Sequence, residues 1–152
     1  CNAITIAEDG EILISGTNVM LGYYNDPEAT AKVIIDGVLH TGDLGYIDDD
    51  GFLFITGRKS NLIVFSDGTK CSPETLEDQI VANTAAEEAL VYQSGVENRA
   101  TLCAKIYLTD VSKKESVINF IENALIRHKF DVINFTEEPL PKNATGKIRR
   151  DF

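Results

Sequence analysis

Four Asp-Gly pairs divide the first part of the chain into short apolar runs. They are Asp9-Gly10, Asp36-Gly37, Asp50-Gly51 and Asp67-Gly68. This dipeptide tolerates the positive φ angles of tight turns, so each pair predicts a reversal between two strands. The runs "EILISG" and "GVLHTGDLGYIDDDGFLFITG" are therefore predicted as strands, with "IDDDG" as a turn and with Phe52 and Phe54 on one face. The first part of the chain is predicted to consist mostly of hairpins.

Three segments carry signals for helix starts. Asp26-Pro27-Glu28 offers an N-cap, a proline and an acid, and predicts a short helix to about Ile35. Ser72-Pro73-Glu74 predicts a second helix, and the capping-box pattern at Ser112–Glu115 predicts a longer third one. The inward-facing residues are expected to be Leu76, Ile80 and Val81 in the second helix and Val117, Ile118, Ile121, Ala124, Leu125 and His128 in the third.

The second part of the chain mixes these helices with short strands. "NLIVF" and "KCS" flank Ser66-Asp67-Gly68 as a predicted hairpin, and "EALVYQSGV", "ATLCAKIYL" and "VINF" are predicted as strands. A short sheet packed against two or three helices makes a small α+β domain.

Composition excludes several classes of function. The formal net charge is -10, which argues against non-specific nucleic-acid binding, because that requires a basic face. No apolar run approaches the roughly 20 residues that cross a bilayer, and no signal-peptide pattern is present, so we expect a cytoplasmic protein. Cys1, Cys71 and Cys103 give neither a disulfide framework nor a metal-ligand pair. We expect a small molecule or a protein as partner.

The acidic chain nevertheless ends on a basic loop, "LPKNATGKIRRDF". "ATGKI" is not a phosphate-binding P-loop, because Pro141 and Ile148 stand where that motif needs a glycine and a Ser or Thr. What remains is Lys147 beside a glycine on a loop expected to be flexible. It could reach a phosphate, or it could belong to a solvated basic tail.

Asp43 is a second candidate for a ligand contact. It follows Thr41-Gly42 after an apolar strand, and a carboxylate at a strand end can accept hydrogen bonds from the two hydroxyls of a ribose. His40 and His128 have no histidine or cysteine partner nearby in the sequence, and "IDDDGF" lacks the spacing of a calcium loop. No metal site is predicted.

Three stretches, in this order, closely resemble late core motifs of the adenylate-forming superfamily. They are "LGYYNDPEATAKVIIDGVLHTGDLGYIDDDGFLFITGRK", "LIVFSDGTKCSPETLED" and "PKNATGKIRR". This superfamily contains acyl-CoA and aryl-CoA synthetases, luciferases and the adenylation domains of peptide synthetases. The resemblance extends from about Gly10 to Phe152.

The resemblance implies a two-step reaction. A small-molecule carboxylate attacks the α-phosphate of ATP to give an acyl-adenylate and pyrophosphate, and coenzyme A then forms a thioester and releases AMP. Mg²⁺ is expected to be held mainly by ATP and by the N-terminal domain of such enzymes. A lipid substrate would allow association with membranes.

The resemblance also implies roles for individual residues. Asp43 is expected to hold the ribose hydroxyls, and Arg58 to contact the nucleotide. Lys147 corresponds to the lysine that reaches the α-phosphate and the carboxylate during adenylation. Ser60 stands at the hinge position, where most members carry an acid or a lysine. Gly68 is expected to line the path of the coenzyme A arm, although many members read Ser-Gly-Gly there.

The same resemblance implies a domain organisation. Residues 1–57 would be the end of a large, β-rich and barrel-like N-terminal domain, and residues 58–152 a small mobile C-terminal domain. The family's phosphate loop, adenine pocket and acyl pocket have no match here, so we expect a C-terminal piece that is inactive alone. The start at Cys1-Asn2-Ala3 indicates either a cut from a longer chain or a cloning remnant.

Within the family, "GRKSNLIVFSDGTKCSPETLED" is most similar to medium- and long-chain fatty acyl-CoA synthetases. A fatty acyl-CoA ligase is therefore the leading hypothesis. An aryl- or acetyl-CoA ligase, an adenylation domain and a non-catalytic module that keeps the fold are the alternatives.

Overall fold

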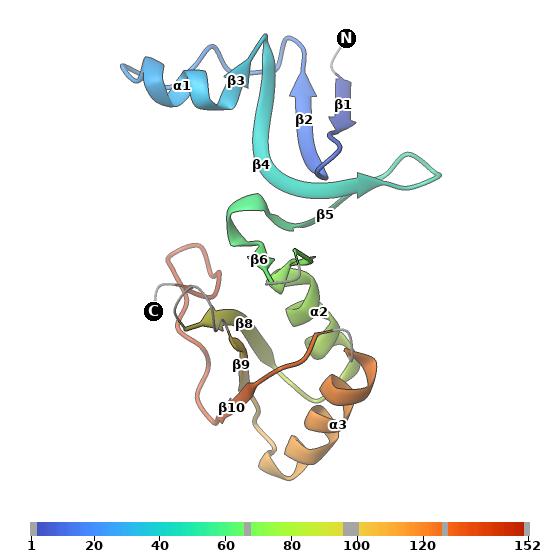
Figure 1. Ribbon diagram of the computed structural model, residues 1–152. Helices are drawn as coiled ribbons and strands as arrows, with labels where there is room; N and C mark the ends of the chain where they lie inside the picture. Colours follow the sequence, from blue (N-terminus) through green and yellow to red (C-terminus); the bar gives the residue numbers. More distant parts are fainter. Residues whose placement is uncertain (1–2, 66–67, 96–100, 126–127, 151–152) are drawn as a thin grey trace. The chain divides into compact units, whose positions relative to one another are not determined.

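The computed structural model describes residues 3–65, 68–95, 101–125 and 128–150 (Figure 1). The chain divides into two compact units, Cys1–Asn61 and Leu62–Phe152. The resemblance had suggested a domain boundary between residues 57 and 58. Each unit is described by itself below.

The first unit is built on a five-stranded antiparallel sheet. Its strands are β1 (Ala3–Ile6), β2 (Glu11–Ser15), β3 (Ile34–Ile35), β4 (Val38–Ile47) and β5 (Leu53–Arg58). The order is β1-β2-β4-β3, with β5 also paired to β4. The α-helix described in this unit, α1 (Pro27–Val33), starts where predicted, because the Asp26 carboxylate accepts a hydrogen bond from the amide of Ala29.

The long strand β4 bends in its middle and so serves two partners (Figure 1). Its first residues pair with β2 and β3, and its second part, from Asp43 to Ile47, pairs with β5, while Leu44 also pairs with Glu11 of β2. Gly42 lies at the bend with φ of +70°, a left-handed conformation that favours glycine. The prediction that Asp43 ends a strand is therefore wrong, because pairing with β5 carries the strand past it.

The predicted hairpins of this unit are confirmed. The turns at Asp36-Gly37 and Asp50-Gly51 join antiparallel neighbours, and both glycines have positive φ angles. Phe52 and Phe54 are both exposed, and Phe54 stacks on Tyr46 with ring centroids 5.2 Å apart.

The second unit combines a three-stranded sheet with two α-helices. The sheet contains β8 (Glu88–Ser94), β9 (Thr101–Tyr107) and β10 (Val132–Thr136), in the order β10-β9-β8. β8 is antiparallel and β10 parallel to β9. The helices are α2 (Pro73–Asn83) and α3 (Lys114–Ala124), and a small antiparallel hairpin consists of β6 (Ile63–Val64) and β7 (Lys70–Cys71). The predicted α+β fold class is confirmed.

One hydrophobic core joins the sheet to the helices of this unit. Its most buried members include Ile80, Val91, Ala104, Ile106 and Val117, all completely inaccessible to solvent. These residues come from α2, α3, β8 and β9, so the helices cover one sheet. The core fixes the platform from which the C-terminal loop extends.

The helix predictions need four corrections. Val81 is 38% exposed and faces outward. Ala124 is exposed, and His128 lies beyond the end of α3. The capping box is wrong, because Asp110 accepts the amide of Ser112 and caps a 3₁₀ turn, η2 (Val111–Lys113), that precedes α3.

Candidate functional site

The predicted nucleotide-binding residues Asp43 and Arg58 form an ion pair in the first unit. The two residues are register partners between β4 and β5. Arg58 Nε lies 2.7 Å from Asp43 Oδ1, and the carboxylate side chain is 27% exposed. The second carboxylate oxygen and the other guanidinium N–H groups give this pair the chemistry to bind hydroxyls and phosphates.

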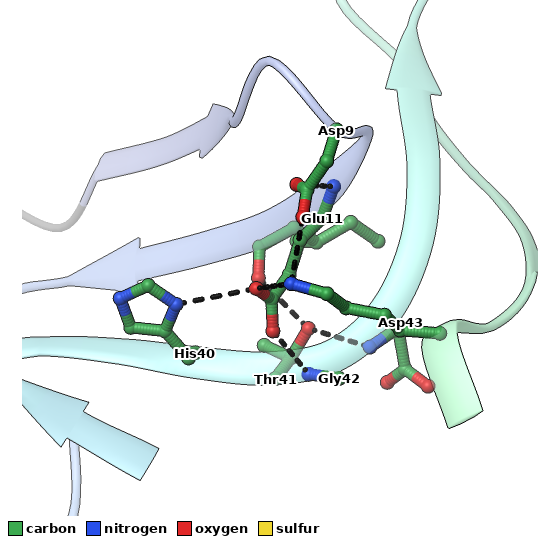
Figure 2. A network of polar contacts seen from close by, with 8 residues as sticks. Asp9, Glu11, His40, Thr41, Gly42 and Asp43 are labelled. Carbon is green, nitrogen blue, oxygen red and sulfur yellow. Dashed lines mark hydrogen bonds and ion pairs between the residues drawn. The ribbon is translucent and has the colours of Figure 1, made fainter. Parts of the chain in front are cut away.

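A buried glutamate supports the backbone under this pair (Figure 2). Glu11 is 5% exposed. Its Oε1 accepts the amide of Gly42 at 2.9 Å, and its Oε2 lies 3.0 Å from Lys59 Nζ and 3.2 Å from His40 Nδ1. We call Glu11, His40, Lys59 and Asp9 the Glu11 network, because Lys59 Nζ also lies 2.7 Å from Asp9 Oδ2.

The Glu11 network keeps its central carboxylate charged. Burial acts to raise the pKa of Glu11, but hydrogen bonds from Lys59, His40 and the Gly42 amide outweigh it and hold this pKa below the ordinary 4.5. The hydrogen bonds to Asp9 and Glu11 raise the pKa of Lys59 above 10.5. Both partners of the central ion pair are therefore ionised at neutral pH.

The hydroxyl of Thr41 fixes the start of the same turn. It donates to the carbonyl of Ile12 at 2.8 Å and accepts the amide of Asp43 at 3.1 Å. Figure 2 shows the Asp43 carboxylate directed away from the Glu11 network. The network thus holds the backbone of the turn and leaves the Asp43 side chain on the opposite side.

Lys147 lies in the second unit on a hairpin-like loop that is closed by its own backbone. Lys142 and Ile148 form an antiparallel bridge. The amide of Asn143 donates to the carbonyl of Lys147 at 2.8 Å, and the amide of Arg149 donates to the carbonyl of Pro141 at 2.8 Å. The loop had been expected to be flexible, yet it is internally hydrogen-bonded.

The side chain of Asn143 occupies the inside of this loop. Its Oδ1 accepts the amide of Thr145 at 3.0 Å, the hydroxyl of Thr145 at 2.7 Å and the amide of Lys147 at 3.0 Å. Gly146 completes the turn with φ of +81°. The Lys147 side chain is exposed, and the described residues provide no ion-pair partner for it.

Two carboxylates of the second unit contact the ends of the loop. Glu88 pairs with Lys142, and Glu77 pairs with Arg150. Burial raises the pKa of Glu77 to about 7, against the lowering effect of the Val91 amide and of Arg150. Four residues of these two regions were not predicted from the sequence: Glu11, Lys59, Glu77 and Glu88. The available signal was a charged residue beginning or interrupting an apolar run.

The remaining predicted site residues are placed as follows. Ser60 lies in the 3₁₀ turn η1 (Lys59–Asn61), where its hydroxyl contacts Asn61 Oδ1 at 3.3 Å. Gly68 has φ of +82° and donates its amide to the carbonyl of Phe65 at 2.9 Å. Its neighbours Ser66 and Asp67 lie outside the described residues. The structure brings Asp43 and Arg58 together, while Lys147 and Gly68 belong to the other unit.

The described residues form neither a cluster of metal ligands nor a helix that could cross a membrane. No group of three or more His, Cys, Asp or Glu side chains among the described residues could hold a metal ion. In the same described part of the chain, every helix is too short or too polar to cross a bilayer.

Two curated relatives are similar over nearly the whole chain. A 2-succinylbenzoate–CoA ligase from Bacillus mycoides is 38% identical over 144 residues, which cover 93% of this chain and 30% of that protein. A long-chain-fatty-acid–CoA ligase from Salmonella typhimurium is 36% identical over 151 residues, which cover 98% of this chain and 27% of that protein. The chain therefore spans about 30% of the length of these relatives. No protein-family model matches it.

Solved structures give the same assignment. The o-succinylbenzoate CoA synthetase (MenE) from Bacillus subtilis, in complex with the acyl-adenylate intermediate OSB-AMP, superposes with a TM-score of 0.82 at 28% identity, covering 97% of this chain and 32% of that one. A structure of the same synthetase with ATP and magnesium gives a TM-score of 0.80 at 29% identity, with the same coverage. In sequence and fold the chain therefore belongs to the adenylate-forming superfamily of AMP-forming acyl-CoA ligases, and it corresponds to the C-terminal part of these enzymes.

Proposed function

We propose that the chain is the C-terminal part of an ATP-dependent acid–thiol ligase. The enzyme would convert a carboxylic acid and ATP into an acyl-adenylate and pyrophosphate, and would then transfer the acyl group to the thiol of coenzyme A with release of AMP. The observation that carries this proposal is that each of the two units presents a charged group that could bind a nucleotide. One unit offers a carboxylate–guanidinium pair, and the other presents the exposed Lys147 ammonium.

In the proposed adenylation step each group has a distinct task. Asp43 would accept hydrogen bonds from the ribose hydroxyls, and Arg58 would contact the nucleotide beside it. Lys147 would offset the charge that develops between the α-phosphate and the carboxylate, and removing one preorganised donor of this kind typically costs roughly 100- to 1,000-fold in rate. Mg²⁺ would be held mainly by ATP and by residues outside this chain. The MenE structure with ATP and magnesium supports the cofactor assignment.

The second step would use Ser60 of the first unit and Gly68 of the second. We propose Ser60 as the hinge position, about which the C-terminal domain turns after adenylation. Lys147 would then leave the phosphate, and the segment around Gly68 would line the path of the coenzyme A arm. Conformational steps of this kind separate the two half-reactions of an enzyme in time.

The acid is proposed to be a fatty acid of medium or long chain. The motif pattern around Arg58 and the long-chain-fatty-acid–CoA ligase at 36% identity support this choice. The 2-succinylbenzoate–CoA ligase at 38% identity favours an aromatic acid as the second candidate. An acyl pocket built from residues outside this chain would decide between them, so an assay must include both classes.

The test is carboxylate-dependent exchange between ATP and pyrophosphate. It would be run on the full-length protein that carries this sequence and on this chain alone, with acetate, benzoate, 2-succinylbenzoate, octanoate and palmitate. We expect exchange in the full-length protein with octanoate or palmitate, and none in the chain alone. Exchange with 2-succinylbenzoate only would replace the fatty acid by the aromatic one. Absence of exchange with every acid would favour the non-catalytic module.

A further inference from the structure

We propose that Glu77 and Glu88 are positioning residues for Lys147, because they hold the two ends of the loop that presents its ammonium group. We call each of these glutamates, together with its partners in the loop, a loop anchor. This inference rests on the proposed function, since the role of Lys147 in adenylation is part of it. Neither glutamate touches the reacting groups, so both would act only through the loop.

The first loop anchor joins the start of the loop to the first residue of β8. Glu88 Oε2 accepts the amide of Leu140 at 2.7 Å, and Glu88 Oε1 lies 2.5 Å from Lys142 Nζ. The Glu88 side chain is 14% exposed, and Leu140 is buried. One carboxylate therefore fixes both the backbone and a side chain where the chain enters the loop.

The second loop anchor joins the end of the loop to α2 and β8. Glu77 Oε1 accepts the amide of Val91 at 2.7 Å, and Glu77 Oε2 lies 2.6 Å from an Nη of Arg150. The other Nη of Arg150 donates to the carbonyl of Val91 at 3.2 Å. The Glu77 side chain is 13% exposed, and Glu74 Oε1 lies 3.4 Å from the same guanidinium. The guanidinium thus binds a side chain and the adjacent strand backbone together.

Hydrogen bonds inside the loop connect the two anchored ends to Lys147. The Lys142–Ile148 bridge joins the two sides of the loop, and Asn143 Oδ1 accepts the amide of Lys147 itself. A loop with such internal bonds moves as one piece, so a shift at either anchor displaces the Cα of Lys147. Misplacement of a catalytic group by about 1 Å can cost roughly 100-fold in rate.

The loop carries both paired cations and one cation without an ion-pair partner among the described residues. Lys142 is paired with Glu88 and Arg150 with Glu77, whereas Lys147 has no ion-pair partner among the described residues. The anchors therefore use two of the loop cations to hold the backbone, and the described part of the chain leaves the Lys147 ammonium available to an anionic ligand.

The experiment uses Glu77→Gln and Glu88→Gln in the full-length protein and measures the two half-reactions separately. We expect adenylation to fall about 10-fold in each variant, a part of the 100-fold that a 1 Å displacement can cost. Thioester formation from supplied acyl-adenylate should stay within about twofold. Asp78→Asn and Glu87→Gln are matched controls, because each replaces an exposed acid next to an anchor.

Hydrogen exchange of residues 141–149 provides a readout that does not depend on activity. We expect faster exchange of these amides in both anchor variants and no change in the controls. Lys142→Met removes one anchor contact from the exposed side of the loop. If a glutamate variant fails to fold, Lys142→Met tests whether the anchor contact positions Lys147.

Three results would overturn the inference. Unchanged exchange in the loop would show that the carboxylates do not hold it. Faster exchange with full adenylation would show that holding the loop does not matter for Lys147. An equal fall of both half-reactions would reveal a general structural role. If the parent protein adenylates no acid at all, the proposed function fails and the positioning role with it, while exchange still reports whether the anchors exist.

Discussion

The bend of β4 at Gly42 and Asp43, here called the Asp43 turn, and the loop that carries Lys147, here called the Lys147 loop, are both held by carboxylates. The carboxylates contact the two regions at different places. Beneath the Asp43 turn, the Glu11 carboxylate lies at the centre and binds the backbone directly, and Asp43 and Arg58 are already paired with each other. In the Lys147 loop, the carboxylates lie at the ends, and the described residues leave Lys147 without an ion-pair partner. A ligand at the first region has to share or replace an existing partner, whereas a ligand at the second meets an available charge.

This comparison predicts that replacing Lys147 lowers the rate of adenylation more than replacing Asp43 does. Lys147→Ala should lower adenylation roughly 100- to 1,000-fold, because a preorganised cation is lost from the reacting phosphate. Thioester formation from supplied acyl-adenylate should change much less. Single-turnover assays of the two half-reactions measure this difference. Lys129→Ala, which removes an exposed lysine elsewhere in the second unit, is the control. A small effect of Lys147→Ala would remove the contrast between the two regions.

The two regions should also respond differently to pH. The pKa of Glu77 is raised from 4.5 to about 7, so the folded state binds its proton more tightly than the unfolded state. This group therefore favours folding more as the pH falls through 7 towards 4.5, by roughly 3 kcal/mol in total. The pKa of Glu11 is lowered, so its contribution is complete above about 4.5 and is lost as the pH falls below that value.

The measurement is the difference in unfolding free energy between the parent protein and Glu77→Gln at pH 8 and at pH 5.5. All other titrations are shared, so the change in this difference isolates Glu77. Asp78→Asn should show no such change. A carbon-13 titration of the Glu77 carboxyl with a midpoint near 4.5 would contradict the prediction.

Asp43→Asn should weaken the proposed nucleotide contact by about 10- to 100-fold. Hydrogen bonds to charged groups contribute about 1.5–3 kcal/mol, and the variant also leaves Arg58 without its ionic partner. The expected change is a higher KM for ATP, measured in the exchange assay. Asp49→Asn, in the exposed turn between β4 and β5, is the control. An unchanged KM would mean that Asp43 serves only to pair with Arg58.

Glu11→Gln should have the smallest effect, a loss of about 1 kcal/mol in stability. The amide keeps the volume and one acceptor oxygen, but it cannot satisfy Lys59, His40 and the Gly42 amide together. Hydrogen exchange of the amides from Gly42 to Leu44 measures the loosening of the turn. Glu8→Gln replaces an exposed acid of the same unit as the control. Equal exchange in both variants would show that the turn does not depend on Glu11.

Local chemistry explains which parts of the fold could be predicted. The turns at Asp9-Gly10, Asp36-Gly37 and Asp50-Gly51 and the Asp26 cap are decided by neighbouring residues, and they are confirmed. The capping box failed because Asp110, two residues upstream of Ser112, competes for the same amide. The prediction that Val81 faces inward was wrong, because helical spacing alone does not say how wide the buried face of α2 is.

The supporting residues of both regions could not be predicted in the same way. Glu11 meets Lys59 across 48 positions, and Glu77 meets Arg150 across 73. Such contacts depend on the register of β4 and on the packing of α2 against β8, which no local pattern specifies. Motif resemblance suggested Asp43, Arg58 and Lys147, and it carried no information about the carboxylates that hold their backbone.

The position of Lys59 has a mechanical consequence. Lys59 is tied to Asp9 and Glu11 in the first unit, whereas Leu62 belongs to the second. Ser60 and Asn61 alone separate these two residues, and two residues supply about four soft backbone dihedrals. In the proposed function, where Ser60 is the hinge, these dihedrals of η1 are the ones that would change. Reorientation of one unit against the other would be governed by a few torsional barriers, and a single substitution at residue 60 or 61 could change its rate.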